Sequence, residues 1–313
     1  MDAQEVADAF GLGRALDLTD PVARGELGEI RRLRTDRGAY AVKQPFDSLS
    51  PQDVVELETS ARFHRACWEA GVPTPEPMLS TRGGVVADLD GEHVLAYTWL
   101  DLADPDTGLD PAVVGELLAV LHRVHGPARG PVHEWFEAPI GEGEWKGVLE
   151  ASRAAGAPYA ERLADLLPQL LEVESILTPT RGVQICHLDL WADNLRRTTE
   201  GGLCVIDFDN CGPADPSREL AMVLFEFGCG DAVRWRRLES AYREAGGPGR
   251  VTGRDSLALT VASLHHIGHR HLTMWLAGRD PEARARSLAG VDEFLGQPLL
   301  MTDVDRLVEA VAH

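Results

Sequence analysis

The chain has 313 residues, of which 44% are hydrophobic and 26% charged, a composition typical of a folded protein long enough for two lobes and unlike a disordered chain. Its formal net charge is −20 at pH 7, and a field of this sign repels phosphate backbones and anionic lipid, so we expect no nucleic-acid and no membrane partner. The same field favours a cationic ligand.

The five cysteines include no C-x-x-C pair and leave one cysteine over, a pattern unlike a disulfide framework or a zinc knuckle, so reduced thiols are expected. The first residues are acidic and contain no apolar run, which predicts that there is no secretory signal. No stretch reaches the roughly 18 consecutive apolar residues that a membrane span needs. These features predict a cytoplasmic protein.

Strand and hairpin patterns dominate the first 100 residues. Residues 30–33 and 39–42 flank an Asp-Arg-Gly turn and predict a β-hairpin. Ser50 and the proline after it form a helix start, and the helix is expected to end near residue 69, before a glycine and two prolines. Residues 84–87 and 93–97 are two further strand candidates.

From residue 101 the pattern becomes mainly helical. Residues 101–108 are polar and rich in turn residues, so we place the lobe boundary there, with an N-terminal lobe of residues 1–100 and a C-terminal lobe of residues 101–313. Residues 131–180 are predicted to form a helical insert. Apolar residues recur at helical spacing over most of the rest, which predicts an α+β fold with a small antiparallel sheet lobe and a larger helical lobe.

Three polar side chains stand where phosphoryl transfer needs them. Asp189 follows a short apolar run at residues 183–186, and Asn194 comes five residues later. Asp207 ends a second run at residues 203–206. If these two runs pair as a hairpin with its tip at residues 200–202, Asn194 and Asp207 lie side by side. A carboxylate that orients a hydroxyl, and oxygen ligands for Mg²⁺, are the parts such a reaction requires.

The run His187-x-Asp189-x4-Asn194, followed by Ile206-Asp207-Phe208-Asp209, resembles the catalytic and metal-binding segments of the aminoglycoside phosphotransferase family. The resemblance implies a bilobal protein-kinase-like fold and an ATP-dependent small-molecule kinase. It also implies that Asp189 is the catalytic base, that Asn194 and Asp207 hold Mg²⁺, and that His187 orders the catalytic loop.

The resemblance extends upstream, to about residue 25. Lys43 resembles the strand lysine that contacts the phosphates of ATP in this family, and the following helix should supply its glutamate partner. Glu56 and Glu58 are the candidates, of which we favour Glu58 because it lies nearer the apolar face of the helix. Tyr97 and Trp99 fall where the family's hinge meets adenine.

Some segments match less well. Residues 24–28 contain two glycines but no G-x-G-x-x-G pattern, so no phosphate loop is assigned there. Glu219 stands where the family usually has aspartate, and we interpret it as structural. The four histidines between residues 265 and 271 are interpreted as helix packing, because no further ligands complete a metal site.

The acceptor divides the functional hypotheses. The first is a kinase of a cationic, amino-sugar-like antibiotic such as an aminoglycoside, which would act in antibiotic resistance. The second is a metabolic kinase of an amino sugar, homoserine, choline, methylthioribose or a fructosamine. Choline is disfavoured, since only 6% of residues are aromatic and a quaternary ammonium needs an aromatic cage. A nucleotide-binding pseudokinase would not need Asp189, and a metal hydrolase would not explain Lys43. No pattern indicates an oligomeric state.

Overall fold

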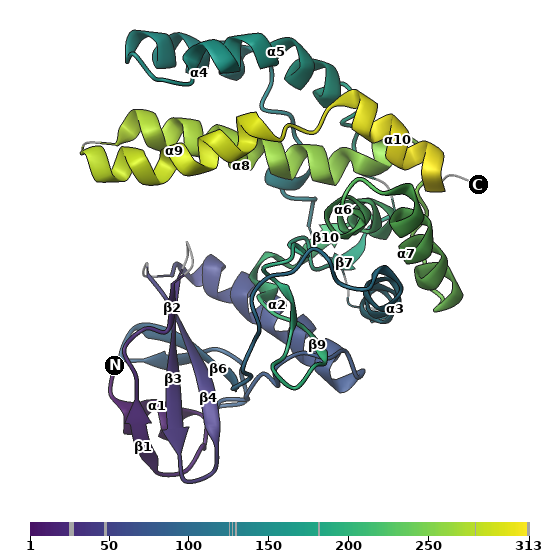
Figure 1. Ribbon diagram of the computed structural model, residues 1–313. Coiled ribbons are helices and arrows are strands. Elements are labelled where there is room, and N and C mark those ends of the chain that lie inside the picture. Colours follow the sequence, from purple (N-terminus) through teal and green to yellow (C-terminus); the bar gives the residue numbers. More distant parts are fainter. Residues whose placement is uncertain are drawn as a thin grey trace. The chain divides into compact units, whose positions relative to one another are not determined.

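The computed structural model describes residues 1–24, 28–46, 49–124, 126, 128, 130–180, 182–278 and 280–311 (Figure 1). The chain forms two compact units, which we call the sheet unit (residues 1–106 and 189–211) and the helical unit (residues 107–188 and 212–313). The predicted α+β fold, with an antiparallel sheet first and helices after it, is confirmed. The domain boundary at residue 100 stays a prediction.

The sheet unit contains an antiparallel sheet in the order β1-β3-β4-β6-β5, with β2 paired to β3. The predicted hairpin is confirmed, since β3 and β4 pair with Ile30 opposite Lys43. One face of the sheet packs on α1, because alternate residues such as Leu33, Val42 and Val94 are fully buried there. The bounds are α1 Ala3–Ala9, β1 Ala15–Leu18, β2 Ala23–Arg24, β3 Gly28–Thr35, β4 Ala39–Pro45, β5 Ala87–Leu89 and β6 Glu92–Thr98.

The opposite face of the sheet carries Lys43. Lys43 is opposite Leu95, and Ala41 is opposite Tyr97, so these residues share the face that points away from Val42. Helix α2 (Pro51–Glu69) begins as predicted at Ser50, whose side chain accepts from the Asp53 backbone while Asp53 accepts from the Ser50 backbone. The expected strand at residues 84–87 begins only at Ala87.

The expected pairing of residues 183–186 with residues 203–206 is wrong. In the helical unit β7 (Gln184–Cys186) pairs with β10 (Gly212–Ala214), whereas in the sheet unit β9 (Leu203–Val205) pairs with β8 (Leu195–Arg197). A hairpin between neighbouring segments closes a shorter loop and therefore loses less chain entropy. The predicted turn at residues 200–202 is the tip of that shorter hairpin, where the Thr198 backbone N–H donates to the Gly202 carbonyl.

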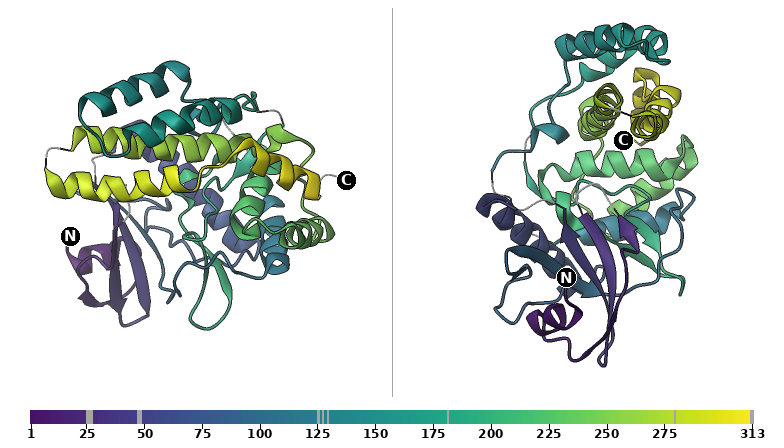
Figure 2. Two further views of the ribbon diagram at one scale, coloured as in Figure 1. Left: turned by 45° about the horizontal axis from the view of Figure 1, so that its top comes forward. Right: turned by 90° about the vertical axis from the view of Figure 1, so that its left-hand side faces the viewer.

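The helical unit contains two groups of packed helices. Helices α3, α6 and α7 pack on one another, with α6 against β7. Helices α4, α5, α8 and α9 form a layered bundle in which α8 and α9 lie side by side (Figure 2). Trp145, Tyr159 and Leu163 are buried in that bundle. No helix among the described residues is long and apolar enough to cross a membrane. The bounds are α3 Pro111–His122, α4 Glu142–Ala154, α5 Ala160–Glu174, α6 Pro216–Gly228, α7 Ala232–Glu244, α8 Ala258–Ala277, α9 Pro281–Gly296 and α10 Met301–Val311.

Candidate active site

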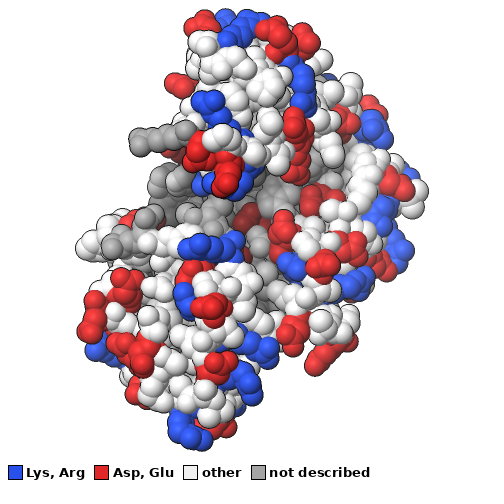
Figure 3. All heavy atoms as spheres, turned by 60° about the vertical axis from the view of Figure 1, so that its left-hand side comes forward, with Lys and Arg blue, Asp and Glu red and all other residues white. Residues whose placement is uncertain are grey.

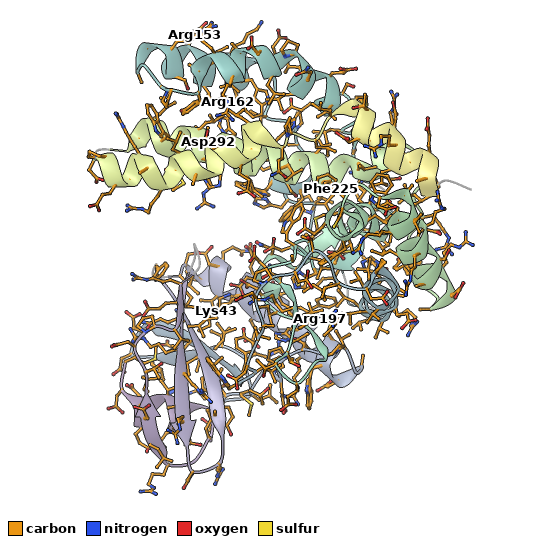
Figure 4. All side chains as sticks on the ribbon, in the orientation of Figure 1. Lys43, Arg153, Arg162, Arg197, Phe225 and Asp292 are labelled. Carbon is orange, nitrogen blue, oxygen red and sulfur yellow. The ribbon has the colours of Figure 1, made fainter. Side chains whose placement is uncertain are left out.

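Lys43 lies on β4 (Figure 4) and binds two carboxylates of the segment that follows β9. Its Nζ is 2.7 Å from Asp207 Oδ1 and 2.6 Å from Asp209 Oδ2. The lysine side chain is 13% exposed, whereas that of Asp207 is 44% exposed, so the aspartate keeps a face open to solvent. Lys43, which the sequence led us to expect beside a glutamate of the following helix, is therefore paired with Asp207 and Asp209 within the sheet unit.

The charge of Lys43 is stabilised by this arrangement. Burial by itself lowers the pKa of the ammonium, but the carboxylates of Asp209 and Asp207 outweigh it and raise the pKa above its usual range. Tyr97 stands beside the same groups, and burial together with the two carboxylates raises the pKa of its hydroxyl. Lys43 is thus a permanent cation and Tyr97 a neutral side chain at physiological pH.

The turn after β9 is held by helix α2. Asp207 has a left-handed backbone with φ of 59°, which begins a 3-10 turn over Phe208–Asn210. Phe208 is buried, and its ring stacks on His64 of α2 at 4.0 Å between centroids with an angle of 2° between the planes. Ser60 of α2 donates to the backbone carbonyl of Asp209 at 3.4 Å. A non-glycine left-handed residue costs of order 1 kcal/mol, so this packing offsets local strain.

Asp189 is bound by two carboxamides. Asn194 Nδ2 donates to Asp189 Oδ2 and to the Asp189 carbonyl, both at 2.9 Å, and Asn210 Nδ2 donates to Asp189 Oδ2 at 3.1 Å. The hairpin brings Asn194 to the segment of Asp207, since the Ile206 backbone N–H donates to the Asn194 carbonyl. The structure therefore brings Asn194 to Asp189 through its side chain and to the segment of Asp207 through its backbone, while the roles expected for the three residues stay predictions.

Sequence reasoning missed Asn210, although a compositional signal was present. The chain contains only two asparagines, Asn194 and Asn210, and both bind Asp189. It also contains only two lysines among its 30 Lys and Arg residues, namely Lys43 and the exposed Lys146 on α4. Apart from Lys146, the lysines and asparagines of this chain are therefore found only among the residues of the candidate site.

The expected ion pair between Lys43 and Glu58 is not formed. Glu58 accepts from the backbone N–H groups of Val85 and Val86 at 3.0 Å and pairs with Arg62 at 2.8 Å. These bonds turn residues 84–86 into a bend, which explains why the strand begins later than predicted. The alternative candidate, Glu56, lies on the exposed side of α2, where it accepts from Gln52.

Tyr97 and Trp99 are the residues expected near adenine. Tyr97 lies on the face of the sheet that carries Lys43, and Trp99 lies just beyond the end of β6. Tyr97 stacks on His64 at 5.3 Å between ring centroids. Trp99 follows the end of β6, where its indole N–H donates to Asp101 and the guanidinium of Arg32 stands 4.6 Å over its ring. The guanidinium of Arg32 and the ring of Trp99 therefore attract each other in a cation–π interaction.

His187 lies in the helical unit, directly after β7, and is fully buried. The next residue, Leu188, has a left-handed backbone with φ of 68°, and its N–H donates to Glu219. Glu219 is fully buried. Burial raises the pKa of its carboxyl, but the bond to His122, the charges of His122 and His187 and the Leu188 N–H outweigh burial and lower it. The interpretation of Glu219 as structural stays a prediction.

His122 continues this network away from Leu188. Its Nε2 is 2.7 Å from the Glu219 carboxylate and its Nδ1 is 2.8 Å from the Tyr242 hydroxyl, which accepts from the Gly249 N–H at 2.7 Å. Because the carboxylate only accepts, the His122 Nε2 carries a proton and donates it to Glu219, while Nδ1 shares a hydrogen bond with the Tyr242 hydroxyl. Every group in this chain of bonds is satisfied, so the start of the catalytic loop is fixed from within the helical unit.

The four histidines near the middle of α8 are not part of the described cluster that has metal-ligand spacing, and their interpretation as helix packing stays a prediction. His265 binds Glu174 at 3.0 Å, and His266 stacks on Trp135 at 5.0 Å between centroids. The described cluster that has metal-ligand spacing is His122, Cys186 and Glu219. Its members are buried, and Glu219 is hydrogen-bonded to both His122 and Cys186.

The comparison with protein families settles the class. The family model of the phosphotransferase enzyme family matches residues 20–259, and the chain belongs to this family, the one that the sequence resembles. The predicted enzyme class, a phosphotransferase with an alcohol group as acceptor, is confirmed with it. None of the curated proteins is similar enough in sequence to count as a match.

Solved structures confirm the fold. Spectinomycin phosphotransferase in complex with ADP and spectinomycin has a TM-score of 0.66 at 12% identity, with 99% of each chain covered. The amicoumacin kinase in complex with AMP-PNP and Ca²⁺ has a TM-score of 0.58 at 14% identity, covering 95% of this chain and 94% of that one. The ethanolamine kinase of Plasmodium vivax has a TM-score of 0.56 at 9% identity, covering 97% and 86%. All three therefore share the fold of this chain.

Proposed function

We propose that this phosphotransferase moves the γ-phosphoryl group of ATP to a hydroxyl group of a small cationic molecule such as an aminoglycoside or a related antibiotic. The observation that carries the proposal is the pair of neighbouring clusters in the sheet unit. One is Lys43 with Asp207 and Asp209, and the other is Asp189 with its carboxamides. A fixed cation, oxygen ligands and a held carboxylate are what this reaction requires of a protein.

Each residue has a distinct role in the proposal. Lys43 binds phosphate oxygens of ATP, and Asp189 accepts the proton of the attacking hydroxyl. Asp207 and Asn194 hold the divalent metal, for which we propose Mg²⁺. They fit it, because carboxylate and amide oxygens are its preferred protein ligands and because Asn194 directs its nitrogen at Asp189, which leaves its oxygen for another partner. When bound, the metal supplies positive charge that neutralises the phosphate oxygens.

The nucleotide assignment has support of two kinds. Spectinomycin phosphotransferase was solved with ADP, and the amicoumacin kinase with AMP-PNP. In this chain Tyr97 shares a sheet face with Lys43, and Trp99 lies just beyond the same strand, so both stand where a base could stack while the phosphates reach the lysine.

The cationic acceptor is supported by charge. The formal net charge of −20 favours the approach of a positive molecule. Two of the similar structures are a spectinomycin phosphotransferase and an ethanolamine kinase, which are named for amine-bearing alcohols. A metabolic amino alcohol or amino sugar is therefore the alternative acceptor, and resistance is the role we propose for an antibiotic one.

The test is ADP release over a panel of aminoglycosides, other antibiotics, amino sugars and amino alcohols. We expect turnover with at least one cationic alcohol. Asp189→Asn should lower kcat by about 100-fold to 10,000-fold, as expected for loss of a general base, while ATP binding stays intact. Asp193→Asn makes the same change at an exposed neighbour and should keep full activity. Silence across the panel, or full activity of Asp189→Asn, would defeat the proposal.

A further inference from the structure

Two amide groups converge on a single oxygen of Asp189. Asn194 Nδ2 lies 2.9 Å and Asn210 Nδ2 lies 3.1 Å from the same atom, Oδ2. An ionised carboxylate only accepts hydrogen bonds, so both carboxamides must present their nitrogen to it. Two donors from different segments fix the rotation of the carboxylate more firmly than one donor could.

The composition of the chain sets the asparagine at position 210 apart from asparagines that only stabilise a turn. Asparagine is favoured at helix caps and turns, yet the helices of this chain are capped by other residues, for example Asp110, Asp215 and Asp231. The two asparagines of the chain stand only at positions 194 and 210. Aspartate has the same shape, but at position 210 it would place a second negative charge against Asp189.

The local backbone explains how position 210 reaches the base. Asp207 directly precedes the 3-10 turn Phe208–Asn210, and Asn210 is the last residue of that turn. The turn that places Asp207 on Lys43 therefore also places Asn210 on Asp189. Asn210 is exposed, so its side chain contributes little to the core.

We propose that Asn210 is a positioning residue for Asp189, acting with Asn194 to hold the carboxylate in the orientation that receives the hydroxyl proton. The inference rests on the proposed function. In the step it serves, the hydroxyl oxygen bonds to the γ-phosphorus while its proton passes to Asp189. The bond from phosphorus to the β,γ-bridging oxygen breaks, and ADP leaves with that electron pair.

The contact can be tested without any acceptor, because [¹⁵N]asparagine labelling gives only two side-chain NH₂ signals in this chain. Asn210→Ala removes one signal and so assigns both. Asp189→Ala should shift both NH₂ signals and speed their hydrogen exchange, whereas Glu200→Ala, at the exposed hairpin tip, should leave both unchanged. An Asn210 signal that does not respond to Asp189→Ala overturns the proposal.

Kinetics with an acceptor from the panel test the consequence. Asn210→Ala should lower kcat roughly tenfold with the KM for ATP unchanged, since even a displacement of order 1 Å at a positioned group is costly. Asn210→Asp keeps the shape of the side chain but places a second negative charge beside Asp189, and it should lower kcat further. Both variants should keep the thermal midpoint, as exposed substitutions usually do. Unchanged kcat, or a raised KM for ATP with kcat intact, contradicts the inference.

The experiments distinguish failure of the positioning role of Asn210 from failure of the proposed function. If the panel shows turnover that depends on Asp189 but not on Asn210, the positioning role is wrong and the proposed function stands. If wild-type protein shows no turnover with any acceptor, the proposed function fails, and the two amide signals alone then decide whether Asn210 binds Asp189.

Discussion

At the scale of single residues, Glu174 of α5 is the carboxylate with the richest set of donors in the described part of the helical unit. It accepts from the indole N–H of Trp145 at 2.9 Å, His265 at 3.0 Å, and the backbone N–H groups of Ile140 and Gly141 at 3.1 and 3.2 Å. It is only 8% exposed. One side chain therefore joins the start of α4 to α5 and α8.

Replacing Glu174 with alanine should lower the free energy of unfolding by about 3 kcal/mol, because two buried side-chain donors and two partly buried backbone N–H groups lose their acceptor. Chemical denaturation measures this loss. Glu172→Ala, an exposed glutamate two residues earlier on the same helix, should change stability by less than about 0.5 kcal/mol. Equal effects of the two substitutions would contradict the structural role of Glu174.

Wild type and Glu174→Ala should also differ in their pH dependence. Burial raises the pKa of Glu174, but the bonds from His265, Trp145 and Gly141 outweigh it and lower the pKa below its ordinary value of 4.5. A carboxyl with a lowered folded-state pKa stabilises fully above the unfolded-state value and loses this contribution as the pH falls through the folded-state value. The stability difference between wild type and Glu174→Ala should therefore be constant near neutral pH and shrink below about pH 4.5. A difference that grows on acidification would show that the sign is wrong.

Individual site residues could be predicted where they lie in a short segment with a recognisable spacing of residue types. Lys43, Asp189, Asn194 and Asp207 lie in short segments of the sequence, and the structure brings Lys43 to Asp207 and Asn194 to Asp189. Glu58 is favoured over Glu56 as the partner of Lys43 only by its position on the helix. The position of a residue on a helix does not determine whether its side chain meets a lysine or a loop. The two backbone N–H groups at Val85 and Val86 bound it instead.

At the scale of elements, the contact between α3 and α7 depends on one small residue. A Cβ added to Gly115 of α3 would lie 2.3 Å from the Leu238 carbonyl and 3.0 Å from the Tyr242 backbone nitrogen. Gly115 is seven residues before His122 and so lies on the same helix face. The absence of a side chain lets α7 approach until the Tyr242 hydroxyl reaches His122.

Gly115→Ala should therefore destabilise the protein by about 2 kcal/mol or more, since backbone atoms must move to admit the methyl group. Gly147→Ala is the matched control within a helix. Gly147 is an exposed position of α4 where an added methyl group would meet no atom within 4 Å, and alanine there should stabilise by about 0.5–1 kcal/mol through its better helix propensity. Denaturation curves of the two variants should move in opposite directions. Movement in the same direction would contradict the close approach of α3 and α7.

Elements with strong local signals were predicted well, and elements defined by distant partners were not. Ser50 begins α2 because its capping bonds are local to residues 50–53. The strand at residues 203–205 is present as predicted, but its predicted partner is wrong, because residues 195–197 lack any apolar alternation and pair only through the turn at residues 198–202. The pairing of β7 with β10 joins segments about 26 residues apart, which no local pattern reveals.

At the scale of the whole molecule, charge is the property that bears most on function. The chain has 50 acidic and 30 basic residues, and on the face shown in Figure 3 the two signs are interspersed. The excess of acid therefore acts as a long-range field, while single ion pairs such as Arg162 with Asp292, which joins α5 to α9 (Figure 4), act locally. Long-range fields are screened by salt more readily than short contacts are.

This field should affect the two substrates in opposite directions. The screening length falls from about 30 Å at 0.01 M salt to about 10 Å at 0.1 M. Added NaCl should therefore raise the KM for a cationic acceptor, whose attraction is weakened, and lower the KM for ATP, whose repulsion is weakened. Steady-state kinetics at several NaCl concentrations measure both constants on the same protein, so each substrate is the control for the other. If the KM of the acceptor falls together with that of ATP, the attraction of the −20 field for the acceptor is refuted. The acceptor would then have to be neutral or anionic, and recognition would depend on contacts made only after encounter.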